Sequence, residues 1–226
     1  MLIDQFPPDS HLAILSHSPT LATPEVDVET GLRRARAASL FMLGLPGSAY
    51  VYQGEELGLP NVDDLPDEVL ADPMFFRTDG EVRGRDGCRV PLPWSGAAAP
   101  YGFSPDRVST WLPQPAGWAG LSVEAQSGDP ASTLELYRAA LRLRHDLPGL
   151  QTEDFAWHEG APSGVLDFFR GPDVRCVVNL SGAPVAVEDG WRAALVSEPA
   201  QDGRIGDDTA AWLVREDAGA PVGAEA

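Results

Sequence analysis

The chain has 226 residues, a formal net charge of −18, and 16 basic residues that are all arginine. A chain of this length can bury one large core or two modest ones. Its acidic balance excludes nucleic acid and anionic membranes as partners, because both require a basic stripe or patch. With no leader peptide and no apolar run approaching the length of a membrane span, a cytoplasmic protein is expected. Cys88 and Cys176 suggest neither a disulfide framework nor a metal site, and no cofactor or metal is expected.

The first predicted elements are a strand, a helix and a second strand. Residues 11–17 form a short apolar run that suits a buried strand. Residues 28–45 have helical spacing, and Pro46-Gly47 ends that helix. The predicted core face of this helix consists of Leu32, Ala35, Ser39, Met42 and Leu43. Residues 48–52 then read as a short buried strand, which stops at a polar loop containing Glu55 and Glu56.

The middle of the chain, residues 59–130, shows no sustained period and predicts a long excursion with a short helix near residues 65–70. A loop of this length is normally functional. Trp94, Trp111 and Trp118 lie within it, and they either stack on a ligand or pin the loop by burial. A strongly amphipathic helix follows at residues 133–146. Its predicted core stripe contains Leu134, Tyr137, Leu141 and the aliphatic stem of Arg144.

From residue 150 onward the pattern is that of short strands separated by Gly, Pro and Asp, which predicts a small antiparallel β-domain with a frayed tail. The predicted strands are residues 155–158, 165–169, 174–179, 185–187, 191–196 and 211–214. The predicted core consists of Phe155, Trp157, Leu166, Phe168, Val177 and Trp191. Asp167, Arg170 and Arg175 are expected to point outward.

The order of helix, tight turn, strand and acidic loop is that of one unit of a (β/α) barrel, in which the loops after the strands build the active site. Adjacent residues that leave a strand point to opposite sides. We therefore expect one of Glu55 and Glu56 to face the mouth of the barrel, and the other to cap the backbone or pair with an arginine.

Two motifs resemble glycoside hydrolase family 13, the family of α-amylases, α-glucosidases and oligo-1,6-glucosidases. Residues 46–59 read P-G-S-A-Y-V-Y-Q-G-E-E-L-G-L, and residues 85–94 read R-D-G-C-R-V-P-L-P-W. The resemblance runs over residues 28–150 and extends to about 215. It implies an α/β fold plus β: residues 1–149 form the last units of an incomplete (β/α)8 barrel, with the strand 7 and 8 region, the long loop and the final helices. Residues 150–226 form the β-sandwich-like domain.

The resemblance also implies where the chemistry lies. The family's nucleophilic aspartate and acid/base glutamate belong to barrel strands that would precede residue 1. Its third carboxylate belongs to an Asn-His-Asp motif whose register falls on Ser16-His17-Ser18; alternatively, the alignment before residue 28 is accidental. No catalytic residue is therefore expected in this chain. The expected substrate-binding residues are His17, Glu55 and Arg89.

Each of these residues has an alternative role. His17 binds sugar or is a satisfied histidine at a strand end. Arg89 grips a substrate group or forms a loop-stapling ion pair with Asp86.

The expected function is that of a C-terminal fragment or remnant of a retaining α-glucosidase in carbohydrate metabolism, inactive alone. The alternative is a non-catalytic glycan-binding or interaction protein. The expected partners are an α-glucoside or oligosaccharide, and a chain that completes the barrel.

Overall fold

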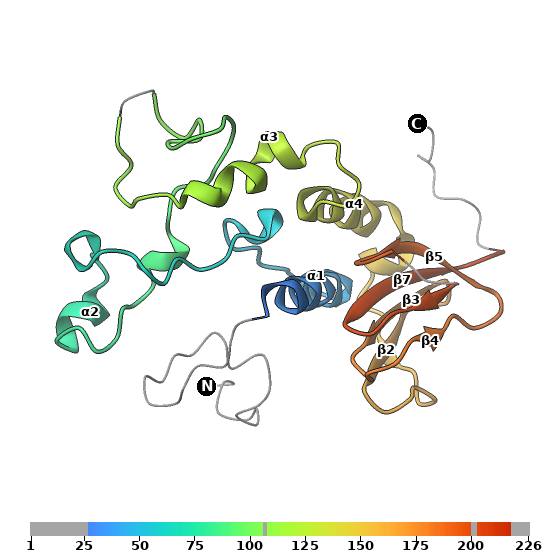
Figure 1. The fold of residues 1–226 in the computed structure, drawn as a ribbon. Coiled ribbons are helices and arrows are strands. Elements are labelled where there is room, and N and C mark those ends of the chain that lie inside the picture. Colours follow the sequence, from blue (N-terminus) through green and yellow to red (C-terminus); the bar gives the residue numbers. More distant parts are fainter. Residues whose placement is uncertain (1–26, 106–107, 200–202, 218–226) are drawn as a thin grey trace.

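The computed structural model describes residues 27–105, 108–199 and 203–217. Three parts lie in a row (Figure 1): a loop-rich excursion, a pair of helices, and a β-sheet. The strand predicted at residues 11–17, and with it His17, lies outside the described residues.

The helical elements, including short 3-10 turns labelled η, are α1 (Val28–Gly44), η3 (Glu55–Leu57), η4 (Asp67–Val69), α2 (Pro73–Arg77), η5 (Asp86–Cys88), η6 (Ala116–Leu121), α3 (Val123–Gln126), α4 (Thr133–Asp146) and η7 (Pro148–Gln151). The strands are β1 (Ala156–Trp157), β2 (Val165–Arg170), β3 (Val174–Asn179), β4 (Val185–Ala186), β5 (Trp191–Val196), β6 (Arg204–Ile205) and β7 (Thr209–Arg215).

Helix α1 confirms the helix predicted at residues 28–45, although its buried face differs from the prediction. The carboxylate of Asp27 caps its first turn by accepting from the backbone N–H of Thr30 at 3.0 Å. Leu43 is buried as predicted, whereas Leu32 is 39% exposed. The most deeply buried side chains on this helix are Ala37, Leu40 and Leu43. The prediction was wrong here because the sheet, which the helical period does not locate, packs on that side.

Helix α4 spans the predicted residues and is capped by Ser132, whose hydroxyl accepts from the N–H of Glu135 at 3.1 Å. Leu134 and Tyr137 are buried as predicted, but Leu141 is 50% exposed. Arg144 lies at the end of α1, where its guanidinium donates to the carbonyl of Leu45 at 2.9 Å and also to the carbonyls of Leu43 and Gly47. Arg144 therefore ties the two helices together, since a cation at a helix C-terminus satisfies carbonyls that have no partner within the helix.

The predicted β-rhythm is confirmed by a five-stranded antiparallel sheet with the order β1-β2-β3-β7-β5. All six predicted strands occur, with small shifts at their ends. Strand β6 was not predicted, because its two residues stand between Gly203 and Gly206 with no apolar run around them. It pairs with β4 in a separate two-stranded sheet.

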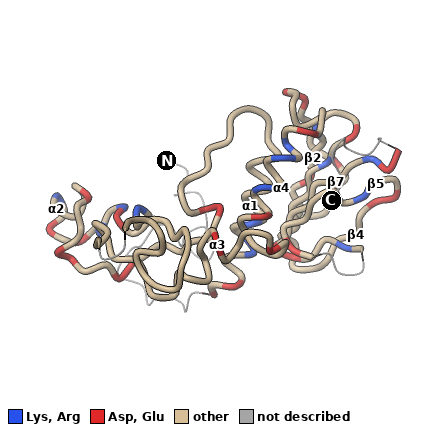
Figure 2. Tube along the Cα trace, turned by 90° about the horizontal axis from the view of Figure 1, so that it is seen from above, with Lys and Arg blue, Asp and Glu red and all other residues tan. Residues whose placement is uncertain are grey.

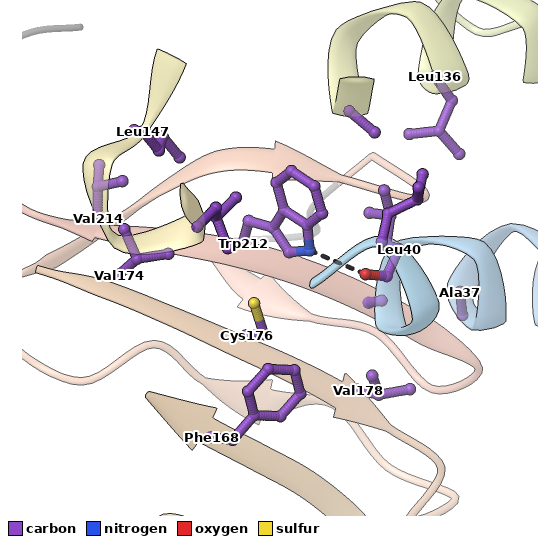
Figure 3. Packing of buried hydrophobic residues seen from close by; sticks show 14 of the residues in the cluster. Ala37, Leu40, Leu136, Leu147, Phe168, Val174, Cys176, Val178, Trp212 and Val214 are labelled. Atoms are coloured by element: carbon purple, nitrogen blue, oxygen red, sulfur yellow. Dashed lines mark hydrogen bonds between the residues drawn. The ribbon is translucent and has the colours of Figure 1, made fainter. Parts of the chain in front are cut away.

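One face of the five-stranded sheet packs on α1 and α4 and forms the main core (Figure 3). Phe168, Cys176 and Trp212 lie opposite one another on β2, β3 and β7 and share this face. The indole N–H of Trp212 donates to the carbonyl of Leu40 at 3.0 Å. A Cβ at Gly44 would come within 2.9 Å of the Cys176 sulfur, so glycine is needed for this close approach. Burial raises the pKa of the Cys176 thiol, which stays protonated.

The opposite face of the sheet is also covered, which overturns the outward placement predicted for three charged residues. Asp167 and Arg175 are 3% and 5% exposed beneath β4 and β6, and Arg170 is fully buried on the α1 side. Burial alone would lower the pKa of Arg175, but hydrogen bonds and charges from Asp167 and Glu188 raise it. Alternation in sequence cannot assign an outer face when both faces are covered.

The predicted β-core is therefore only partly correct. Phe168, Val177 and Trp191 are buried, and Phe155 packs against the main core. Trp157 and Leu166 are exposed at 54% and 39%.

Arg170 joins the sheet to the helical part of the chain. Its guanidinium donates to the carbonyls of Asp154 at 2.9 Å, Leu150 at 3.3 Å and Thr152 at 2.5 Å, and also to Gly44 at the end of α1. Burial lowers its pKa, yet arginine stays charged in this setting. One buried cation thus donates to four backbone carbonyls.

We expect Arg170→Met to lower the free energy of unfolding by about 3 kcal/mol or more, because it leaves several buried carbonyls unsatisfied. Urea denaturation measures this change. Arg192→Met is the matched control, since Arg192 is exposed on β5. An Arg170→Met variant within about 0.5 kcal/mol of the control would contradict this bridging role.

Candidate functional site

The segment after α1 leads to the acidic loop, but residues 48–52 form no strand, contrary to the prediction. Tyr50 and Val51 are 86% and 41% exposed. A parallel strand needs neighbours that cover its faces and pair with its edges. The described part of the chain supplies no such neighbour for residues 48–52, and all its strand pairs are antiparallel.

The two glutamates of the acidic loop have different surroundings. Gly54 enters the loop with a φ of 92°, and its N–H donates to the carboxylate of Glu56 at 2.8 Å. Glu56 therefore has the capping role expected for one member of the pair. Glu55 is exposed at the start of η3.

Tyr137 on α4 lies next to this loop. The hydroxyls of Ser39 and Tyr137 share a hydrogen bond at 2.7 Å, and the Ser39 hydroxyl also lies 2.8 Å from the carbonyl of Ala35. Burial raises the pKa of Tyr137, and the nearby carboxylates of Glu55 and Glu56 raise it further. The phenol therefore stays protonated next to the acidic loop.

The second motif, residues 85–94, is held by buried carboxylates. Asp86 accepts from the backbone N–H groups of Ala71 at 2.7 Å and Asp72 at 2.8 Å. A guanidinium nitrogen of Arg89 lies 3.1 Å from Asp72 and 3.7 Å from Asp86. The ion pair that holds the loop together, one of the two roles predicted for Arg89, is thus present. Asp72 is a nearer partner of Arg89 than Asp86.

Asp72, which is 1% exposed, is a member of this site that was not predicted from the sequence. Its signal was the position before Pro73, since aspartate followed by proline is a common helix start. Asp72 accepts from Met74 at 2.9 Å and from the N–H of Arg85 at 3.1 Å. The pKa of Asp72 lies below its ordinary value, chiefly through the Met74 hydrogen bond, with help from the backbone and charge of Arg85 and the charge of Arg89.

The two motifs meet at Tyr52 and Cys88. The Cys88 thiol lies 3.7 Å from the Tyr52 hydroxyl, within reach of a weak sulfur hydrogen bond. The contact with Cys88 and partial burial raise the pKa of Tyr52, and Arg89 acts in the opposite direction. The residue that ends the 48–52 segment is therefore in contact with the R-D-x-x-R loop, as a shared site requires.

The excursion has a hydrophobic core of its own, which contains one of its three tryptophans. Trp118 is 4% exposed and pins the loop by burial. Trp94 and Trp111 are 48% and 63% exposed, and Trp111 packs edge-on against Phe103 with ring centroids 5.3 Å apart. Of these three tryptophans, Trp94 and Trp111 are therefore the exposed ones.

Charge and metal chemistry add little to the site. Acidic and basic positions are interspersed along the traced elements (Figure 2). Within the described ranges, no group of three or more His, Cys, Asp or Glu residues could hold a metal ion. Among the helices that the structure describes, none is long and apolar enough to cross a membrane.

Comparison with known proteins adds evidence from outside the chain. The sequence model of the family described as "Alpha amylase, catalytic domain" matches residues 20–153. The chain is 34% identical over 149 residues to a "Probable alpha-glucosidase" of Rhizobium meliloti, covering 65% of this chain and 26% of that protein. It is 30% identical over 190 residues to "Trehalose synthase/amylase TreS" of Mycobacterium tuberculosis, covering 73% of this chain and 28% of that one.

Solved structures give the same picture. An α-glucosyl transfer enzyme, XgtA, superposes with a TM-score of 0.66 at 33% identity, covering 81% of this chain and 36% of the enzyme. Isomaltulose synthase from Erwinia rhapontici NX5 superposes with a TM-score of 0.65, covering 80% and 38%; at 19% identity this likeness concerns the fold alone. The chain spans about a quarter of the length of the curated relatives described above.

We expect the excursion to loosen in acid through Asp72. Because the folded pKa of Asp72 is lowered, its stabilising contribution is present above the unfolded value near 4 and is lost as pH falls through the folded value. Limited proteolysis between pH 5 and pH 2.5, with an acid-active protease, should show accelerating cleavage within residues 60–105. Asp72→Asn should cleave faster already at pH 5 and change less with pH, whereas exposed Asp64→Asn should follow the wild type. Identical pH profiles for all three would contradict the assignment.

Proposed function

Since the chain belongs to the α-amylase family of glycoside hydrolases, we propose that it forms the C-terminal portion of a retaining α-glucosidase acting on α-linked glucosides. One observation carries the proposal. The matches cover most of this chain but only 26–38% of the relatives. In this proposal the rest of the barrel comes from a partner chain, and the chain described here is inactive alone.

The proposed substrate-binding residues surround the junction of the two motifs. Glu55 is exposed on the acidic loop, and Arg89 is half-buried beside Tyr52. A carboxylate and a guanidinium can accept from and donate to neighbouring sugar hydroxyls. His17, outside the described residues, is the third proposed ligand. Glu56 is left out because its carboxylate caps Gly54.

The proposed inactivity follows from the chemistry of retention. A retaining glycosidase needs a nucleophilic carboxylate and an acid/base carboxyl about 5–5.5 Å apart. The acidic loop offers two adjacent carboxylates, one of which is already bonded to the backbone. Asp72 and Asp86 are engaged in holding their own loop. None of these groups is placed as a matched catalytic pair.

The proposed partner would cover the exposed segment at residues 48–52. Tyr50, Val51 and Tyr52 are large apolar side chains with 41–86% exposure, next to an end of α1 that is fixed by Arg144. A neighbouring parallel strand would bury them and pair their backbone. This segment would then become the barrel strand predicted from sequence.

A non-catalytic glycan-binding protein is the second candidate. The exposure of Trp94 and Trp111 favours it, because exposed aromatic rings are suited to pack on the apolar face of a sugar. In that case the chain would bind an oligosaccharide without cleaving it.

We expect the purified chain to show no hydrolysis of maltose, isomaltose or a nitrophenyl α-glucoside above a buffer blank, because the paired carboxyls are missing. Product assays by chromatography and absorbance measure this. Any turnover should be tested in Glu55→Gln, with Glu68→Gln as an exposed acidic control. Activity that disappears in Glu55→Gln but persists in Glu68→Gln would contradict the proposed inactivity and would locate an active site in this chain.

A further inference from the structure

The sheet face that turns away from α1 contains a hollow of about 310 Å³. Strands β4 and β6 lie over it, and its apolar walls include Val165, Val177, Ile205 and Leu213. Its volume lies at the lower end of the range of small-molecule sites, which have mostly apolar walls and a few polar groups. None of the residues of the acidic loop or of the R-D-x-x-R motif contributes to it.

One end of this hollow is charged. The guanidinium of Arg175 donates two hydrogen bonds to the carboxylate of Asp167, from Nε to Oδ1 at 2.8 Å and from Nη2 to Oδ2 at 2.5 Å. Nη2 also donates to Glu188 at 3.0 Å, and His158 Nδ1 lies 2.9 Å from Asp167. Buried charges of this kind cost free energy, and apolar side chains of similar volume are often as stable or more so. A contribution to stability therefore does not by itself explain why charged residues are buried here.

Two groups at the charged end have hydrogen-bonding capacity left. Nη1 of Arg175 is buried and lies 2.9 Å from Glu188, but its N–H groups make no hydrogen bond of normal geometry with the described residues. The Glu188 side chain is 56% exposed and lines the hollow. A donor and an acceptor thus lie side by side against apolar walls.

The charge of the cluster selects the class of ligand. Two carboxylates, those of Asp167 and Glu188, face the one guanidinium of Arg175, so an anion is repelled, and a cation would compete with Arg175 for its own partners. A neutral molecule with adjacent hydroxyls can accept from Arg175 and donate to Glu188. The C–H face of a sugar ring can pack on the aliphatic walls. We infer that this hollow is a binding site for a neutral pyranose, separate from the acidic loop and beyond the proposed hydrolytic function.

The test is sugar binding by the full chain, with methyl α-glucoside as the probe in saturation-transfer NMR and calorimetry. We expect a dissociation constant on the order of 1–10 mM. Glu188→Gln should weaken binding about tenfold, because it removes a charged hydrogen-bond acceptor. Asp189→Asn is the matched control, since it removes the same charge from the next, exposed residue and should leave binding unchanged.

Two further variants distinguish the hollow from the acidic loop as the place where the sugar binds. Val185→Phe on β4 should fill the hollow and abolish binding, while the melting temperature stays the same or rises. Glu55→Gln removes any binding at the acidic loop, which is the other proposed site, so the binding assigned to the hollow is the part that persists in this variant. No binding by the wild type at about 10 mM sugar would overturn the inference. Binding that persists in Glu188→Gln and Val185→Phe would also overturn it, and loss in Glu55→Gln alone would assign the binding to the acidic loop.

Discussion

The contact between the C-terminal half of α1 and the Phe168–Cys176–Trp212 row is the interaction on which the rest of the structure depends. It brings the end of α1 so close to the sheet that only glycine fits at position 44. Arg170 reaches the same point from the sheet, and Arg144 reaches it from α4. The direction in which the chain leaves α1, and hence the position of the acidic loop, is fixed by these contacts.

This arrangement bears on how the chain divides into domains. Short local strands suggested a β-domain that stands apart from residues 1–149. In the structure, the main core has fifteen buried residues: six come from α1 and α4, two from the segment just after α4, and seven from the sheet. The boundary near residue 150 remains a prediction, but the strands share their largest apolar surface with the helices that precede them.

Much of the fold could be predicted because the local signals agree with the tertiary structure. Ser132 and Pro148-Gly149 bracket α4, and Val174–Asn179 is an apolar run of strand length. The failures have a common cause. Asp167, Arg175 and Leu141 were placed by period alone, and period does not show how many faces of a sheet or helix are covered.

The candidate site was predictable in its motifs but not in its contacts. Glu55 and Arg89 lie in motifs whose order is visible in sequence. The contact of Tyr52 with Cys88, and the buried partner Asp72, depend on how the excursion folds back. The strand expected at residues 48–52 needs neighbouring strands that the described residues do not provide. The segment therefore forms no strand, although its residues favour one.

Native-state hydrogen exchange tests most directly whether α1, α4 and the sheet form one cooperative unit that fixes the acidic loop. We expect the slowest amides of α1, α4, β3 and β7 to open with the same free energy and the same denaturant dependence. Early exchange of α1 and α4, with β3 and β7 still protected, would contradict this cooperativity and would make the sheet an independent domain.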